Sequence, residues 1–418
     1  MNQGKTIFSQ IMDYAPKNIF DQLVSEYKGN YRFRTFSCWD QFLCLAFAQL
    51  TFRESLRDIE TCLRSNSEKL YHMGIKGNIS RTNLSRSNET RDWKIFARFA
   101  NHLIQEALSL YTKDELIYKE LDNSLYALDS TTIDLCLSLF PWAKFRKNKS
   151  AVKLHTLLDI RTSIPTFIHI TSGKVHDVNI LDLISIETSA FYIIDKGYID
   201  FERLFTLKNK NAFFITRAKK NLACQRIYSH DVSKYEYIRY DQTVELTGVK
   251  TSTLYPEQIR RIKFIDKEND KELIFLTNNF SLDADMIARL YKDRWKIELF
   301  FKWIKQHLRI KSFYGTSENA VKIQIYSAIS VYVMIAIIKK KLNITESLYT
   351  ILQILSINIF SKVLINQLLN KNYNSNQNYR SITNCFYSTF NGTVVKTNNI
   401  LLHFKINFHI RSKKTYIN

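Results

Sequence analysis

The sequence has few of the residues that interrupt regular structure or bind soft metals. Its 418 residues include only 9 glycines and 4 prolines, and 45% of them are hydrophobic. This composition indicates a globular chain and excludes a disordered or collagen-like one. The six cysteines form no CxxC pair and no zinc spacing with histidine, so we expect reduced, mostly buried thiols of a cytosolic protein. They are Cys38, Cys44, Cys62, Cys136, Cys224 and Cys385.

Long apolar segments are also scarce. The N-terminus lacks the apolar core of a signal peptide. The most apolar run, from Ile323 to Ile338, contains Gln324, Ser327 and Ser330. A membrane-spanning helix needs about 20 predominantly apolar residues, so this run favours a buried helix. We therefore expect a cytoplasmic protein that is neither exported nor anchored in a membrane.

Acidic residues are outnumbered. The chain has 60 Lys and Arg against 39 Asp and Glu, a net charge of +21 and a pI near 9.5. A soluble protein this basic usually meets a polyanion, and nucleic acid is the commonest one. A generally basic proteome or a membrane-surface protein is the alternative interpretation.

The hydrophobic period divides the chain into three regions. Residues 1–118 have a helical period throughout, which predicts an all-helical N-terminal domain. Residues 119–340 alternate between strand and helix signals, with a strand-like, Tyr- and Lys-rich insertion at about 218–272. Residues 341–418 are predicted to be helical up to about 370, and a polar, Asn-rich tail follows.

The N-terminal region contains a pattern that resembles a helix-turn-helix. A helix over 55–64 is followed by glycines and by a second helix that Ser80 can cap. Arg81 and Arg86 stand at the polar front of that second helix, where they could contact DNA. A plain helical hairpin with a solvated face explains the same pattern equally well.

The central region predicts a mixed sheet flanked by helices, because three adjacent strands precede strands that alternate with helices. The expected strands are 124–129, 152–160, 164–170, 191–195 and 213–216, with a return strand at 273–277. Two of them end on a carboxylate, Asp129 and Asp195. Carboxylates at strand ends emerge at a sheet edge, where ligands bind.

A third carboxylate lies in the stretch from Tyr291 to Lys305. On one continuous helix, Tyr291, Arg294, Glu298 and Lys305 share a stripe about 60° wide. A second stripe of Leu290, Ile297, Phe301, Ile304 and Leu308 would seat that helix on a core. An ordinary i,i+4 ion pair between Arg294 and Glu298 explains the helix alone, so the aspartates upstream decide the interpretation.

Asp129, Asp195 and Glu298 together would present hard oxygen ligands to Mg²⁺ or Mn²⁺. Two such ions can activate a nucleophile and stabilise the leaving oxygen in phosphoryl transfer. Each aspartate alone is explained as a turn or cap residue. The combination in a strongly basic chain favours metal-dependent chemistry on nucleic acid.

The motifs LDSTTI (128–133), IIDKGY (193–198) and Y-x2-R-x3-E-x6-K (291–305) resemble those of IS4-type insertion-sequence transposases of the DDE superfamily. The resemblance implies an RNase H-like core and a catalytic, metal-binding triad of Asp129, Asp195 and Glu298. It implies that Tyr291, Arg294 and Lys305 contact phosphates of the transposon end. It also implies cleavage at terminal inverted repeats, strand transfer to target DNA, two metal ions, and a homodimer on double-stranded DNA, in a bacterial cell.

One departure from the family concerns base stacking. Well-known members stack a flipped base on a tryptophan in the insertion, and residues 218–272 contain none. A tyrosine could substitute, because stacking needs only an aromatic face. The available tyrosines are Tyr228, Tyr235, Tyr237, Tyr240 and Tyr255.

Other residues allow two interpretations. The basic run of Lys144, Arg146, Lys147 and Lys149 could follow a phosphate backbone or form a solvated loop. His155 could assist the site, although a hydrogen-bonded core histidine is the favoured interpretation. Trp295 and Trp303 lie off the catalytic stripe, and packing is favoured over base stacking for both.

Three functions compete. The leading one is an active DNA transposase. The second is a catalytically inactive, sequence-specific DNA-binding protein derived from a transposase, against which the intact carboxylates argue. The third is a structure-selective nuclease without strand transfer.

Overall fold

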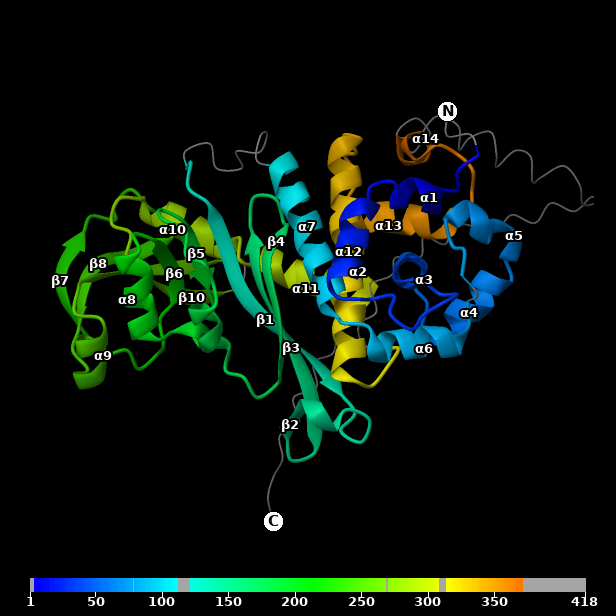
Figure 1. Ribbon diagram of the computed structural model, residues 1–418. Coiled ribbons are helices and arrows are strands. Elements are labelled where there is room, and N and C mark those ends of the chain that lie inside the picture. Colours follow the sequence, from blue (N-terminus) through cyan, green and yellow to red (C-terminus); the bar gives the residue numbers. More distant parts are fainter. Residues whose placement is uncertain (1–3, 78, 112–120, 268–269, 308–312, 371–418) are drawn as a thin grey trace, which may run out of the picture. The chain divides into compact units, whose positions relative to one another are not determined.

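A ten-stranded mixed sheet forms the centre of the chain (Figure 1). The computed structural model describes residues 4–77, 79–111, 121–267, 270–307 and 313–370, and these belong to one compact unit. The strands run in the order β2-β3-β1-β5-β6-β10-β9-β8-β7, and β4 pairs with β3. Their bounds are β1 Leu125–Leu135, β2 Lys144–Arg146, β3 Lys149–Asp159, β4 Pro165–Ser172, β5 Phe191–Ile194, β6 Phe213–Arg217, β7 Cys224–His230, β8 Ile238–Leu246, β9 Ile259–Asp266 and β10 Lys271–Thr277.

Five of these strands have the RNase H-like arrangement. β3 runs antiparallel to both β4 and β1, whereas β1, β5 and β6 are parallel neighbours. The first three strands are thus joined by hairpins and the next two by crossovers. The predicted fold class, a mixed sheet flanked by helices, is confirmed.

Both faces of the sheet are covered. The four residues of β5 are all buried and alternate between two cores. Phe191 and Ile193 pack with the cluster that includes α10 and α11. Tyr192 and Ile194 pack with the cluster that includes α8. Since neighbouring residues of a strand point to opposite faces, the continuous apolar run of β5 reflects burial on both sides.

Helices precede, interrupt and follow the strands. Those of the described residues are α1 Ile7–Met12, α2 Lys17–Glu26, α3 Cys38–Leu50, α4 Leu56–Arg64, α5 Ser67–Leu70, α6 Arg81–Thr90, α7 Lys94–Tyr111, α8 Phe201–Asn209, α9 Val249–Leu254, α10 Ala284–Lys292, α11 Trp295–His307, α12 Glu318–Lys341, α13 Leu348–Ile357 and α14 Ile365–Asn370. Short 3₁₀ helices are η1 Tyr71–Met73, η2 Pro141–Ala143, η3 Asp177–Asp182 and η4 Lys196–Tyr198.

Helix α12 lies at the centre of a helical group that combines N-terminal helices with helices that follow the sheet. It packs against α7, α3, α6 and α13 (Figure 1). By length and composition it could span a membrane, but 94% of its most apolar stretch is buried inside the protein. The expectation of a buried helix at Ile323–Ile338 is confirmed.

The segment between α4 and α6 differs from a helix-turn-helix. Ser80 caps α6 as predicted, by accepting a hydrogen bond from the Asn83 amide. However, α5 and η1 occupy part of residues 65–80, whereas the motif joins its helices by a turn of three to four residues. The glycines alone did not reveal these two extra turns of helix.

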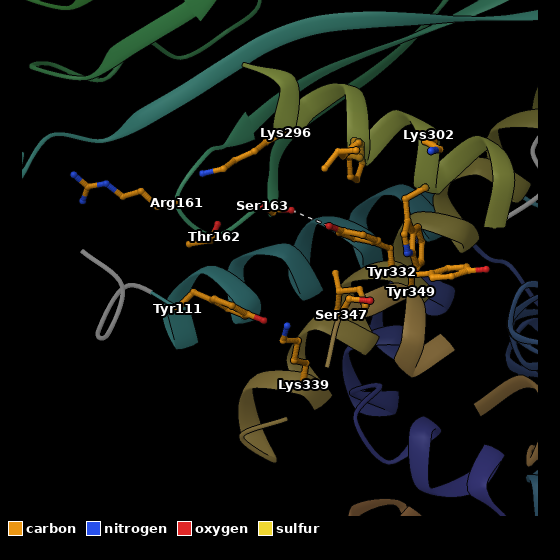
Figure 2. A pocket seen from close by; sticks show the side chains of 14 residues that line it. Tyr111, Arg161, Thr162, Ser163, Lys296, Lys302, Tyr332, Lys339, Ser347 and Tyr349 are labelled. Atoms are coloured by element: carbon orange, nitrogen blue, oxygen red, sulfur yellow. Dashed lines mark hydrogen bonds between the residues drawn. The ribbon is translucent and has the colours of Figure 1, made fainter. Parts of the chain in front are cut away.

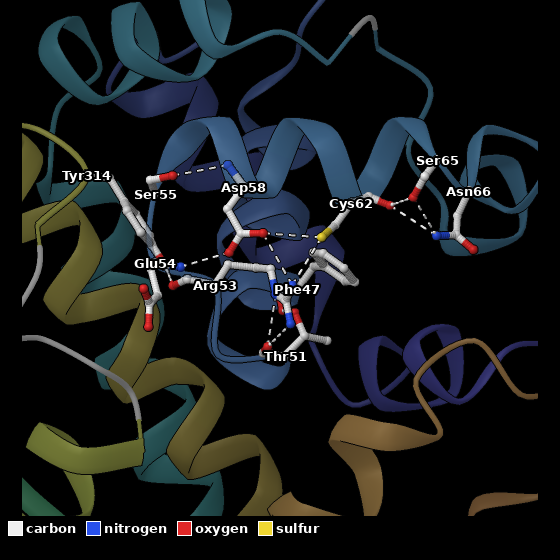
Figure 3. Close-up of polar contacts among 10 residues, drawn as sticks. All are labelled: Phe47, Thr51, Arg53, Glu54, Ser55, Asp58, Cys62, Ser65, Asn66 and Tyr314. Carbon is white, nitrogen blue, oxygen red and sulfur yellow. Dashed lines mark hydrogen bonds and ion pairs between the residues drawn. The ribbon is translucent and has the colours of Figure 1, made fainter.

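A polar cluster holds the start of α4 (Figure 3). Ser55 accepts from the Asp58 amide, and Arg53 donates to Asp58 over 3.3 Å. The Tyr314 hydroxyl donates to the Arg53 carbonyl over 2.8 Å. This contact ties the segment that follows α11 to the N-terminal helices.

The stretch from Tyr291 to Lys305 is not one helix. Asp293 and Arg294 separate α10 from α11. There the amides of Arg294, Lys296 and Ile297 bond to carbonyls three residues earlier, each over 3.1 Å. This tighter 3₁₀ spacing keeps the apolar residues buried, so the hydrophobic period did not reveal the break. Leu308 of the predicted apolar stripe lies outside the described residues.

Several smaller expectations can be compared with the structure. Three strands, β7, β8 and β9, lie within residues 218–272, and β10 is the return strand. The basic run lies on the exposed β2–β3 hairpin instead of a loop.

Of the cysteines in the described residues, Cys38 and Cys44 are buried, whereas Cys62, Cys136 and Cys224 are at least partly exposed, so the expectation of mostly buried thiols was wrong.

Candidate active site

Asp129 and Asp195 occupy matching positions on two neighbouring strands. β1 and β5 pair from Leu125 with Phe191 to Leu128 with Ile194. Each aspartate is the residue that follows the last pair. β5 ends there, so Asp195 follows a strand as predicted, but β1 continues to Leu135 by pairing with β3. The prediction that Asp129 ends its strand was therefore wrong, because β3 supplies a partner that β5 does not.

Glu298 is linked to Asp129 through Arg294. The Arg294 guanidinium donates from Nη1 to Asp129 Oδ2 over 2.9 Å and from Nη2 to Glu298 Oε1 over 2.5 Å. The side chain of Arg294 is 14% exposed, against 21% for Asp129 and 58% for Glu298. The break between α10 and α11 thus carries a cation that two of the predicted triad carboxylates share.

Asp195 has its own arginine. Arg217, the last residue of β6, donates from Nη2 to Asp195 Oδ1 over 2.8 Å. Asp195 Oδ2 also accepts from the Gly197 amide over 3.3 Å. Burial alone would raise the pKa of Asp195, but these hydrogen bonds outweigh it and lower that pKa below its ordinary value. Sequence reasoning missed Arg217, although a cation ending a strand beside the Asp195 strand was a usable signal.

The environment of Asp129 acts in the opposite direction. Burial raises the pKa of Asp129 to about 6, and the nearby Asp195 and Glu298 carboxylates add to that rise. The Ser130 amide and Arg294 oppose it. Carboxylates with divergent pKa values in one cluster are typical of functional sites.

Tyr291 lies between the two arginines. Its ring is 6% exposed and packs on Phe275, with ring centroids 4.8 Å apart. The guanidinium carbons of Arg217 and Arg294 lie 5.9 and 5.8 Å from its centroid. The buried ring therefore positions both arginines in this structure.

Lys305 joins α11 to the strand that carries Asp129. Its Nζ donates to the Thr132 carbonyl over 2.8 Å. Arg81 and Arg86 lie elsewhere, on α6, with both side chains exposed. In the described part of the chain, neither arginine forms an ion pair with the three carboxylates.

A second polar group adjoins the site. Ser130 donates to Asp177 over 2.8 Å, and Lys153 pairs with the same carboxylate over 3.1 Å. His155 is fully buried and its Nε2 is 2.8 Å from Thr171 Oγ1. Burial lowers the pKa of His155 to about 4, so it is a neutral core histidine, as favoured. Asp177 was not predicted from the sequence.

The structure confirms some of the predictions for tryptophan and tyrosine side chains and contradicts others. Trp303 is buried as expected, whereas Trp295 is 49% exposed, so the packing expectation for Trp295 was wrong. Tyr255 is 1% exposed and packs on Phe205, which leaves its ring no open face for a base. Tyr228 is 60% exposed and keeps such a face.

The described residues contain no group of three His, Cys, Asp or Glu side chains arranged around one metal position. Arginines neutralise the three carboxylates instead. The donor chemistry nevertheless fits Mg²⁺ or Mn²⁺, because all three groups supply hard oxygens and each is already paired with a cation.

Comparison with known proteins identifies the family. A family profile described as "Transposase DDE domain" matches residues 120–334. This chain belongs to the transposase DDE domain family. A second profile, a domain of unknown function (DUF4372), matches residues 3–76. The resemblance to DDE-type transposases is confirmed.

The chain is similar to three bacterial proteins named as transposases. It is 36% identical over 225 residues to y4zB of Sinorhizobium fredii, and 28% identical over 229 residues to the IS5377 protein of Geobacillus stearothermophilus. Each match covers 53% of this chain and only 62% or 60% of the relative. The IS4SA protein of Synechocystis is 25% identical over 328 residues, 76% of this chain and 88% of that protein.

One solved structure, a piggyBac transposase synaptic complex with hairpin DNA, aligns with a TM-score of 0.44 and 10% identity, over 93% of this chain and 86% of that one.

Proposed function

We propose that the chain is a DNA transposase that cleaves the terminal inverted repeats of an insertion sequence and joins them to target DNA. The observation that carries the proposal is the meeting of Asp129 and Asp195 at the end of the β1–β5 pair, with Glu298 tied to Asp129 through Arg294. Three carboxylates from distant segments converge on one edge of an RNase H-like sheet. They are assigned as the catalytic residues.

Asp129, Asp195 and Glu298 would hold two Mg²⁺ or Mn²⁺ ions, the number that the family resemblance implies. Bound ions would polarise the phosphodiester and lower the pKa of an attacking water. The protein's own contribution is to hold the carboxylates together before any metal binds. Arg294 and Arg217 offset the repulsion among them.

Arg294 has two roles in the proposal. Without DNA, the Arg294 guanidinium bridges Asp129 and Glu298. A phosphate of the transposon end could instead accept two hydrogen bonds from the same guanidinium. DNA would thereby draw Arg294 away and leave both carboxylates for metal. Tyr291 supports Arg294 in either position, and Lys305 is assigned to the phosphates on the same side of α11.

A cationic cavity beside Asp195 supports DNA as the substrate. Its volume is about 270 Å³, and its lining includes Lys196, Arg217, Lys219, Lys220 and Arg261 against one carboxylate, Glu272. Such a concentration of positive charge suits a phosphate backbone.

The remaining assignments follow from the division of the chain. We assign DNA binding to the helical region 1–118 through Arg81 and Arg86, and catalysis to 119–340. Double-stranded DNA is the partner, in the cytoplasm of a bacterium. A homodimer is proposed because two transposon ends must be brought together.

The experiment is cleavage of the element's own terminal DNA with Mg²⁺ or Mn²⁺ and with EDTA, for wild type, Asp129→Asn and Glu298→Gln. We expect metal-dependent cutting by the wild type only. Both variants should bind the same DNA nearly as well as wild type, because the carboxylates serve the chemistry. Tight binding without cutting by the wild type under either metal would establish the inactive DNA-binding alternative, and cutting without strand transfer would establish a nuclease.

A further inference from the structure

A separate cavity lies on the other side of α11 from the catalytic carboxylates. Its volume is about 740 Å³. Leu299, Phe300 and Trp303 line it from α11. At about 100° per residue, these three positions point roughly 100–160° away from Glu298 around the helix, whereas the lining residue Lys302 lies only about 40° from Glu298. The cavity is therefore distinct from the site described above, although it shares α11 with it.

Aromatic side chains form much of its wall. Tyr332 donates from its hydroxyl to the Ser163 carbonyl over 3.0 Å (Figure 2). Trp303 packs edge-on to Tyr332 with ring centroids 4.5 Å apart, and Phe300 does so at 5.1 Å. Tyr349 is 45% exposed. The Phe300, Trp303 and Tyr332 rings are 3%, 8% and 3% exposed and form a closed wall, so Tyr349 is the aromatic lining residue that keeps an open face.

The charged lining residues are all cations. Arg161, Lys296, Lys302 and Lys339 line the cavity, and no Asp or Glu does. Lys296 pairs with Asp293 over 2.8 Å. In the described ranges, the Lys302 and Lys339 side chains form no ion pair or hydrogen bond, and the buried Arg161 Nε has no partner. Arg161 Nη2 donates to the Leu121 carbonyl. Lys302 and Lys339 are therefore the lining cations most available to an anionic ligand.

We propose that this cavity binds a nucleotide unit of a nucleic-acid strand, with its phosphate on the cations and its base on the exposed ring of Tyr349. A small inorganic anion would leave the Tyr349 ring unused, and an apolar ligand would leave the charges unpaired. The volume lies within the range of small-molecule sites. Only the naming of DNA as the source rests on the proposed function.

The ligand is an unpaired nucleotide. A base inside a duplex stacks on its neighbours and must leave the stack before a protein ring can contact it. Binding of this kind tolerates any base, since every base has a π-face. The cavity thus assigns to this chain a single-strand contact outside the β-rich insertion, where tryptophan is missing.

The test uses a fluorescein-labelled oligothymidylate of about eight nucleotides, in EDTA, with the full-length protein. Fluorescence anisotropy should show that Lys339→Glu, which changes a lining cation outside α11, weakens binding by roughly tenfold. Tyr349→Ala should weaken it by about tenfold through lost stacking. Lys94→Glu is the matched control, because it makes the same type of charge change at the start of α7, about 25 Å along that helix from Tyr111. Thermal unfolding confirms that each variant is folded.

Equal oligonucleotide affinity in wild type and all folded variants overturns the proposal. Competition by free thymidine monophosphate as strong as by the oligonucleotide would keep the nucleotide chemistry and identify a free nucleotide as the ligand. Metal-dependent cleavage of a duplex end by the wild type is measured separately. If the wild type cleaves the duplex end but all variants bind the oligonucleotide equally well, only the role of this cavity is disproved. If the wild type does not cleave but the charge-reversed variant binds the oligonucleotide more weakly, only the proposed transposase activity is disproved.

Discussion

At the scale of single residues, Asp129 is held in an environment that disfavours its charge. Burial raises its pKa from 3.8 to about 6, even though Arg294 donates to it. A carboxylate needed only for stability would be expected to have the opposite shift. Asp195, paired with Arg217, has that opposite shift. Neighbouring carboxylates with divergent environments are expected where charge serves chemistry.

This shift predicts how stability depends on pH in metal-free protein. Between about pH 4 and 6 the folded state binds more protons at Asp129 than the unfolded state, so stability falls as pH rises through that window. The full shift corresponds to an order of 2–3 kcal/mol. Asp129→Asn should therefore be more stable than wild type at pH 8, by about 1–3 kcal/mol, and similar to it near pH 4.

Urea unfolding in EDTA at several pH values measures the effect. Asp134→Asn changes an exposed carboxylate on the same strand and should leave the pH profile as in wild type. A profile for Asp129→Asn that is parallel to wild type would show that Asp129 does not carry this destabilisation.

At the scale of elements, the break between α10 and α11 places Arg294. A straight helix would continue past Tyr291 with amides bonded four residues back, but here the amides of Arg294, Lys296 and Ile297 bond only three residues back. Such short 3₁₀ stretches within a helix often mark functional sites. The break places Arg294 against β1 while Glu298 stays within its reach.

Arg294→Ala should have opposite effects on two ligands. Binding to transposon ends should weaken, and the slope of log affinity against log salt should fall by about 1, because one phosphate contact is lost. Mn²⁺ affinity without DNA should rise, because Asp129 and Glu298 lose their internal cation. Electron paramagnetic resonance of free Mn²⁺ and fluorescence anisotropy measure the two affinities.

Arg294→Lys is the control for that prediction. It keeps the charge but loses the two-pronged geometry, so both effects should be intermediate. A parallel loss of Mn²⁺ and DNA affinity in Arg294→Ala would instead identify Arg294 as a structural residue.

At the scale of the whole molecule, the two ends of the described chain stabilise each other. The amides of Ile7 and Phe8 bond to the carbonyls of Ser361 and Ile359. Gln10, 3% exposed, donates to the Val363 carbonyl over 2.7 Å and accepts from the Ile365 amide over 2.9 Å. The N-terminal helices therefore depend on residues more than 350 positions away.

Gln10→Ala should destabilise the protein by about 1–3 kcal/mol, because buried backbone groups near Val363 lose their partner. Chemical denaturation measures the change in the free energy of unfolding. Gln353→Ala, at an exposed position of α13, is the comparison and should have little effect. Equal stabilities of the two variants would show that the link contributes nothing measurable.

The sequence by itself determined those features that depend on residue type and local spacing. The alternation and apolar runs around residues 124–216 specified a mixed sheet, and the buried run at Ile323–Ile338 specified a core helix. The identities of Asp129, Asp195 and Glu298, with the motifs around them, were sufficient for the family. These signals are local because side-chain period and chemistry are properties of neighbouring residues.

Only the tertiary structure decided which distant residues meet. The register that sets Asp129 beside Asp195, the approach of Arg217 to Asp195, and the cavity between Tyr111 and Tyr349 all join segments far apart in the chain. Pairing of strands and packing of helices create these contacts, and no local pattern encodes their partners. The break at Arg294 escaped prediction for a related reason: the apolar period continues through it, while the contact that gives it a role lies on β1.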